Sequence, residues 1–86
     1  YYAQLLKEFN QNRVLATAAY NAGPSRVRRW LAESNGQLDA MSFIESIPFT
    51  ETREYVQAVL SYRLIYEAQK QQPQPLFNEA ELKFHY

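Results

Sequence analysis

The apolar residues near the start of the chain recur at the spacing of one helical face. Positions i, i+3, i+4 and i+7 of this face are Tyr2, Leu5, Leu6 and Phe9. This spacing predicts a short first helix. Asn10 to Asn12 then form a polar break. The segment from Arg13 to Tyr20 predicts a second helix, because it is rich in alanine, the best helix former.

Glycine and proline divide the middle of the chain, and Asn21 to Pro24 is predicted to be a turn. Gly23 can take a positive φ at the end of the second helix, and Pro24 suits the first position of a third. This third helix should end before Gly36, with its inward side chains at Val27, Trp30 and Leu31. A fourth short helix is predicted from Asp39 to Glu45, with Asp39 as its N-cap.

The longest helix is predicted to begin at Thr50. The link Ile47-Pro48-Phe49 before it should be extended, because a residue that precedes proline avoids the helical region. Thr50 is a suitable N-cap, and Glu51 falls in the first turn, where the helix dipole favours an acid. About five turns of helical spacing follow, marked by Tyr55, Val56, Val59, Leu60, Arg63 and Tyr66. We expect this helix to end before Pro73.

The C-terminal part of the chain has a different composition. Gln69 to Pro75 reads as a polar, proline-broken linker. Asn78 and Glu81 then have the spacing of a capping box for a short last helix. The sequence therefore predicts an all-α fold without a β-sheet. Residues 1–72 should form its main part, and residues 73–86 a proline-broken tail with a short helix.

Charge and composition exclude several classes of function. Nine basic and nine acidic side chains balance, whereas nucleic-acid binding favours a basic excess. The chain has no cysteine and one histidine, His85 in the tail. The sequence therefore predicts no nucleophilic triad, no metal site and no cofactor. No apolar run approaches the ~20 residues that span a bilayer.

Two segments carry candidate chemistry. Tyr20 and Asn21 place a phenol and an amide at a helix end, where both could bind a sugar or a carboxylate; the alternative is a packed tyrosine and a turn-capping asparagine. Glu51 and Tyr55 share one face of the longest helix, because they are four residues apart. The alternative for Glu51 is that its negative charge only interacts favourably with the helix dipole and has no role in a site.

A third segment is basic. Arg26, Arg28 and Arg29 form a small basic cluster beside Trp30. With the turn from Asn21 to Pro24 before it, the stretch from Leu15 to Leu31 has the outline of a helix-turn-helix. The competing interpretation is a solvated helical face with one or two ion pairs. The neutral overall charge favours this second interpretation.

Taken together, two of these segments resemble the soluble lytic murein transglycosylase family. They are Ala18 to Val27 (AAYNAGPSRV) and Glu45 to Val56 (ESIPFTETREYV). Their order, spacing and residue types are similar to the C-terminal part of that family's catalytic domain. The resemblance covers residues 1–66 closely and implies a lysozyme-like helical domain, of which this chain is the incomplete C-terminal portion.

The resemblance also implies a function for the parent protein. Family members are lytic transglycosylases, which cleave the bond between N-acetylmuramic acid and N-acetylglucosamine in peptidoglycan and form anhydromuramic acid. Tyr20 is then expected to hydrogen-bond the catalytic glutamate or the substrate acetamido group, and Asn21 to shape the turn. Glu51 and Tyr55 are expected to line the cleft. The implied partner is the peptidoglycan glycan strand, and the implied location is the periplasm or cell envelope of a bacterium.

One part of the family pattern is absent from these residues. The catalytic glutamate of the family lies in a Glu-Ser pair followed by Gly-Leu-Met-Gln, and nothing before Tyr20 matches; Glu45-Ser46 comes too late and is a false match. We therefore expect the catalytic glutamate upstream of Tyr1, and no lytic activity from this chain alone. The other partner would be the N-terminal part of the same domain or a complementary chain. The alternatives are a small helix-turn-helix DNA-binding module and an inactive glycan-binding remnant.

Overall fold

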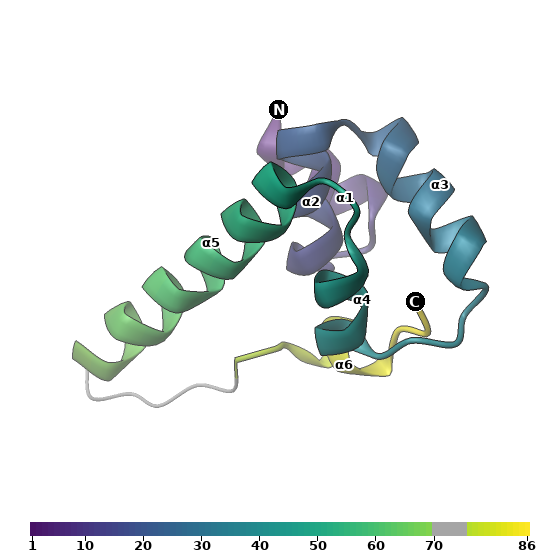
Figure 1. Ribbon diagram of the computed structural model, residues 1–86. Coiled ribbons are helices and arrows are strands. Elements are labelled where there is room, and N and C mark those ends of the chain that lie inside the picture. Colours follow the sequence, from purple (N-terminus) through teal and green to yellow (C-terminus); the bar gives the residue numbers. More distant parts are fainter. Residues whose placement is uncertain (70–75) are drawn as a thin grey trace.

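Helices and connecting loops, with no strand, make up the part of the chain that the structure describes, residues 1–69 and 76–86 (Figure 1). The structure is a computed structural model. The helices in these ranges are α1 (Tyr2–Glu8), α2 (Arg13–Ala22), α3 (Pro24–Ser34), α4 (Ala40–Ser46), α5 (Thr50–Gln69) and α6 (Glu79–Lys83). They cover more than half of the chain, so the predicted all-α class is confirmed.

The predicted breaks between the first three helices occur where expected, with one difference. Asn12 caps α2, because its side chain accepts a hydrogen bond from the Leu15 backbone N–H at 3.1 Å. Gly23 has a φ of 96°, and Pro24 is the first residue of α3. However, α2 continues to Ala22, so the prediction that the turn begins at Asn21 was wrong. The Gly23 N–H still bonds the Ala19 carbonyl at 2.8 Å, which extends the helical ladder past Asn21.

The starts of α4 and α5 follow the same local rules. The Asp39 side chain accepts from the Ser42 backbone N–H at 2.8 Å and caps α4, as predicted. Thr50 was predicted to be the N-cap of α5, but it is the first helical residue. The carbonyl of Phe49 accepts the first helical hydrogen bond, from the Arg53 N–H at 2.9 Å. The helix therefore begins one residue earlier than its cap residue suggested.

Helix α2 lies at the centre of the fold and packs against α1, α3 and α5. Its residues from Val14 to Ala19 are all buried. The other helices and the C-terminal segment add the remaining large core side chains, which include Leu5, Phe9, Val27, Trp30, Phe43, Ile44, Ile47, Val56, Leu60, Phe77 and Tyr86. The core thus unites residues from both ends of the chain.

Helix α5 is packed in its first half and exposed in its second. Thr52, Val56 and Leu60 are buried, whereas Tyr62, Ile65 and Tyr66 are more than half exposed. Figure 1 shows the C-terminal half of α5 extending away from the other helices. The apolar spacing predicted this helix, and the predicted end before Pro73 is consistent with its last residue, Gln69.

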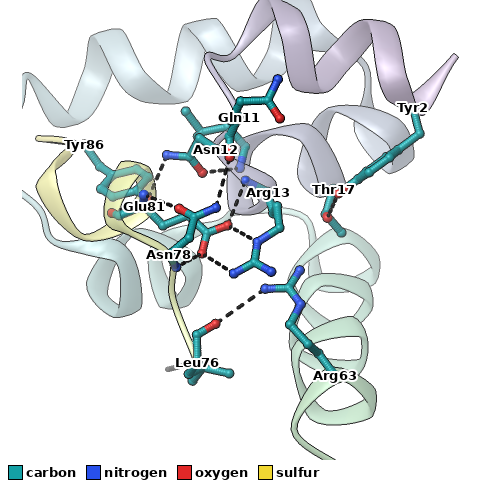
Figure 2. A network of polar contacts seen from close by, with 11 residues as sticks. Tyr2, Gln11, Asn12, Arg13, Thr17, Arg63, Leu76, Asn78, Glu81 and Tyr86 are labelled. Carbon is teal, nitrogen blue, oxygen red and sulfur yellow. Dashed lines mark hydrogen bonds and ion pairs between the residues drawn. The ribbon is translucent and has the colours of Figure 1, made fainter. Parts of the chain in front are cut away.

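The described part of the C-terminal segment packs on the domain. The predicted capping box is present, since the Asn78 side chain accepts from the Glu81 N–H while the Glu81 side chain accepts from the Asn78 N–H. Figure 2 shows how Glu81 and Tyr86 meet the start of α2. His85 is exposed. The predicted linker starts at Gln69, the last residue of α5; its remainder and the predicted boundary after residue 72 lie outside the described residues.

Candidate functional site

Tyr20 lies in the last turn of α2 within a cluster of tyrosines. Its side chain is 52% exposed. The ring centroids of Tyr1 and Tyr2 each lie 6.2 Å from its own. The Tyr2 hydroxyl also lies 3.3 Å from the Thr17 hydroxyl, one turn before Tyr20 on α2 (Figure 2). Aromatic faces and hydroxyl groups therefore gather where α1 meets the end of α2.

An open pocket of about 280 Å³ adjoins this cluster, and we call it the tyrosine groove. Its lining residues come from three helices and are Tyr2, Thr17, Tyr20, Tyr55 and Val59. The structure thus places Tyr20 and Tyr55, from the two separate sequence segments, on one hollow surface. A groove of aromatic rings with several hydroxyl groups suits a ligand that has both apolar faces and polar edges.

Glu51 lies one helical turn before Tyr55 on α5 and, at this spacing, on the same helical face. Its side chain is exposed, and it is not among the residues that line the tyrosine groove. None of the described side chains forms a hydrogen bond or an ion pair with its carboxylate. Glu51 therefore lies on the same face of α5 as Tyr55 but outside the groove lining. Its predicted position in a cleft stays a prediction.

Asn21 joins the two sequence segments directly. Its Oδ1 accepts a hydrogen bond from the Thr52 hydroxyl at 2.7 Å, across 31 positions of sequence. Asn21 is half-buried and Thr52 is buried. Asn21 therefore does more than shape a turn: it ties the end of α2 to the first turn of α5.

The link before α5 is fixed by side chains from α3 and α5. Arg53 donates from Nη1 to the Ile47 carbonyl at 3.2 Å. The Phe49 ring packs edge-on against Trp30, at 5.5 Å between centroids, and the Arg26 guanidinium lies 4.7 Å from its centre. These contacts set the position at which α5 starts, and with it the positions of Thr52 and Tyr55.

Arginines of the basic cluster on α3 contact other side chains of the chain. Arg28 forms an ion pair of 2.8 Å with Glu8, and its guanidinium lies 5.5 Å from the centre of the Phe9 ring. Arg26 contacts Phe49, as described above. One of the three arginines thus forms an ion pair and a second contacts an aromatic ring, which favours the interpretation of a helical face with one or two ion pairs over a surface that binds DNA.

Sequence reasoning missed four residues at this site. Thr17 precedes Tyr20 by three residues and Val59 follows Tyr55 by four, so helical spacing from the chosen tyrosines would have found both. Tyr2 was assigned only to a helical face. Thr52 was not predicted to belong to the site, because nothing in its spacing indicates a hydrogen-bond partner in α2.

No group of histidine, cysteine, aspartate and glutamate side chains that could hold a metal ion occurs among the described residues. Within those same ranges, no helix has both the length and the apolar character needed to span a membrane. The residues that line the tyrosine groove offer hydroxyl groups for hydrogen bonding and aromatic rings for packing.

Two family models match the chain. One is described as the transglycosylase SLT domain and matches residues 1–43, half of the 86 residues; the other is described as the soluble lytic transglycosylase helical domain and matches residues 46–75. Among curated relatives, a soluble lytic murein transglycosylase of Salmonella typhimurium is 46% identical over the whole chain. The Escherichia coli K12 protein of the same name is 53% identical over 77% of the chain.

Solved structures agree in fold. The 70 kDa soluble lytic transglycosylase from Escherichia coli matches the whole chain with a TM-score of 0.92 and 44% identity. An inactive mutant of lytic transglycosylase Slt from Pseudomonas aeruginosa matches 94% of the chain with a TM-score of 0.84 and 52% identity. The chain spans only 13% of the Salmonella relative, 10% of the Escherichia coli relative, and 14% and 13% of the two solved chains.

These matches agree with the lysozyme-like helical fold implied by the sequence resemblance, and they do not favour the helix-turn-helix alternative. They cover both segments that carry the resemblance, from Ala18 to Val27 and from Glu45 to Val56. The chain therefore belongs to the family of soluble lytic transglycosylases defined by the SLT domain.

Proposed function

We propose that this chain is part of a peptidoglycan lytic transglycosylase and that it binds the glycan strand at the tyrosine groove. The reaction of the whole enzyme would be cleavage between N-acetylmuramic acid and N-acetylglucosamine with formation of anhydromuramic acid. Such an enzyme acts where peptidoglycan lies, in the periplasm or cell envelope of a bacterium.

The observation that carries this proposal is that Tyr20 and Tyr55 line one groove in a chain of this family. Each phenol has an apolar ring to pack against a sugar and a hydroxyl to donate to or accept from it. Neither hydroxyl forms a hydrogen bond with another described residue. Both are therefore available to a ligand.

Glu51 has a supporting role in the proposal. It lies at the N-terminal end of a 20-residue helix, where the helix dipole places a partial positive charge that suits an acidic side chain. A carboxylate next to a reacting sugar can stabilise positive charge that develops on it. We therefore assign to Glu51 an electrostatic contribution beside the groove.

Glycan binding tests the proposal directly. The chain, carrying ¹³C-labelled tyrosine rings, is titrated with soluble oligomers of alternating N-acetylglucosamine and N-acetylmuramic acid. The ring signals of Tyr20 and Tyr55 should shift saturably, while that of Tyr62, which is 72% exposed on the same helix, should not. A titration without saturable shifts, or with shifts at Tyr62 alone, would contradict the proposal.

A second experiment addresses cleavage. We expect no anhydromuropeptides by mass spectrometry when the chain alone is incubated with isolated murein sacculi, because these residues contain no Glu-Ser pair that is followed by Gly-Leu-Met-Gln. General acid catalysis contributes about 10²- to 10⁴-fold, so its loss should be evident. Release that disappears in Glu51→Gln would show that Glu51 is itself the acid and would overturn the role assigned to it.

A further inference from the structure

The bond between Thr52 and Asn21 orients the amide of the residue that directly follows Tyr20, a lining residue of the tyrosine groove. The Thr52 side chain is buried, with 1% of its surface exposed, and its hydroxyl donates to Asn21 Oδ1 at 2.7 Å. An amide side chain has an accepting oxygen at one end and a donating nitrogen at the other. Because the oxygen accepts from Thr52, the nitrogen is directed away from the Thr52 hydroxyl.

The Asn21 nitrogen is available to a ligand. It has no hydrogen-bond partner among the described residues, and no side-chain nitrogen or oxygen of these residues is both buried and unpaired. The Nδ2 group of Asn21 therefore reaches solvent. Asn21 directly follows Tyr20, which lines the groove, and Thr52 comes three residues before Tyr55, which lines it from the other side.

Packing alone does not explain a hydroxyl at position 52. Valine has nearly the shape of threonine, and Val56, on the same buried face one turn later, is also 1% exposed. Without the hydroxyl, the terminal torsion of asparagine is broad and roughly two-fold, so the amide can turn over. Its oxygen and nitrogen would then exchange places, and the outward donor would no longer be defined.

We infer that Thr52 is a positioning residue, which holds Asn21 so that its Nδ2 group donates a hydrogen bond to an oxygen of the bound glycan. This inference rests on the proposed function, because it assigns the geometry of the same binding site. Both segments are needed for this geometry, because α2 supplies the amide and α5 supplies the hydroxyl that orients it. Thr52 itself does not contact the glycan.

Three variants test this role. Thr52→Val should weaken glycan binding about 2- to 10-fold, the range expected for one neutral hydrogen bond. Thr52→Ser keeps the hydroxyl and should retain the wild-type affinity within about 2-fold. Asn21→Ala removes the amide, and in that background Thr52→Val should cause no further loss, since a residue that acts through another loses its effect once the other is gone.

Measurements without ligand separate this inference from the proposed function. The ¹⁵N order parameter of the Asn21 side-chain amide should be high in wild type and Thr52→Ser and low in Thr52→Val, with unchanged backbone spectra showing that all three are folded. An unchanged order parameter in Thr52→Val, or a loss of affinity that persists in the Asn21→Ala background, would overturn the inference alone. Failure of the wild-type chain to bind glycan would overturn the proposed function and the inference with it.

Discussion

The carboxylate of Glu81 receives three hydrogen bonds from Arg13, although the two residues are 68 positions apart in sequence (Figure 2). The Arg13 backbone N–H and Nε donate to Oε2 at 2.8 and 2.9 Å, and Nη2 donates to Oε1 at 3.2 Å. The Asn78 N–H adds a fourth, at 2.7 Å. Because the Glu81 side chain is fully buried, this contact fixes α6 to the first turn of α2.

Glu81→Ala should lower the free energy of unfolding by about 3 kcal/mol, because it leaves partly buried donors of Arg13 and Asn78 without their acceptor and removes a fully buried side chain. The matched control is Glu79→Ala on the same helix. Glu79 forms an ion pair with Lys83, and the Glu79 side chain is 79% exposed. An exposed pair of this kind contributes less than about 1 kcal/mol. Urea unfolding followed by circular dichroism measures both; equal losses would contradict the role given to Glu81.

Tyr86 is buried beside this contact and makes stability depend on pH in the alkaline range. Its hydroxyl accepts from Asn12 Nδ2 at 3.0 Å and donates to the Glu81 carbonyl at 2.9 Å. Burial, opposed by the Asn12 hydrogen bond and aided by the charge of Glu81, raises the pKa of Tyr86 from 10.0 to about 12. The folded chain therefore holds this proton more tightly than the unfolded chain.

The contribution of Tyr86 should be complete below about pH 10 and disappear as the pH rises to about 12, since ionisation is easier in the unfolded chain. Tyr86→Phe should cost about 1 to 3 kcal/mol at neutral pH, because the Asn12 amide loses its buried acceptor. The difference in unfolding free energy between wild type and this variant should narrow across that range of pH. A constant difference would show that Tyr86 does not titrate as described.

Asp39 should give the opposite dependence, in acid. Its cap of α4 involves hydrogen bonds from the backbone and the side chain of Ser42, and these lower the pKa of Asp39 below its ordinary value of 3.8. The stabilisation is therefore present above that value and is lost as the pH falls through the lowered pKa. Asp39→Ala should reduce the melting temperature at neutral pH and approach wild type in acid. Asp39→Asn is the control, because its cap does not titrate and its advantage over alanine should stay constant with pH.

Local sequence rules predicted the helices well because caps and turns depend on residues close together in the chain. Gly23, Asp39 and the Asn78–Glu81 capping box all lie where these rules place them. The same rules could not indicate that Arg13 would reach Glu81, or that Tyr86 would enter the core. Those contacts depend on how the chain folds back on itself, and residue spacing carries no information about that.

The candidate site shows the same division. The two tyrosines were candidates because of their residue type and helical position, and the family resemblance gave them a role; the structure places Tyr20 and Tyr55 in one groove. A one-dimensional pattern could not supply Tyr2, which reaches the groove only because α1 packs on α2. Nor could it supply Thr52, whose partner is in another helix.

The last prediction concerns the two groove hydroxyls. Tyr20→Phe and Tyr55→Phe keep the rings but remove one hydroxyl each, so each should weaken glycan binding about 2- to 10-fold if that hydroxyl bonds the sugar. Folding should change little, because neither hydroxyl has a hydrogen-bond partner among the described residues. Tyr62→Phe is the control: it removes the same group from the same helix as Tyr55, at a position 72% exposed and outside the groove lining.

Isothermal titration calorimetry with the same glycan oligomers gives the three affinities. The double variant Tyr20→Phe/Tyr55→Phe adds a finer test. If the two hydroxyls bond one ligand independently, the losses in binding free energy of the single variants should add in the double variant. A smaller combined loss would mean that the two tyrosines serve one shared contact. If Tyr62→Phe weakened binding as much as the groove variants, the glycan would lie along the exposed face of α5, and the tyrosine groove would not be the binding site.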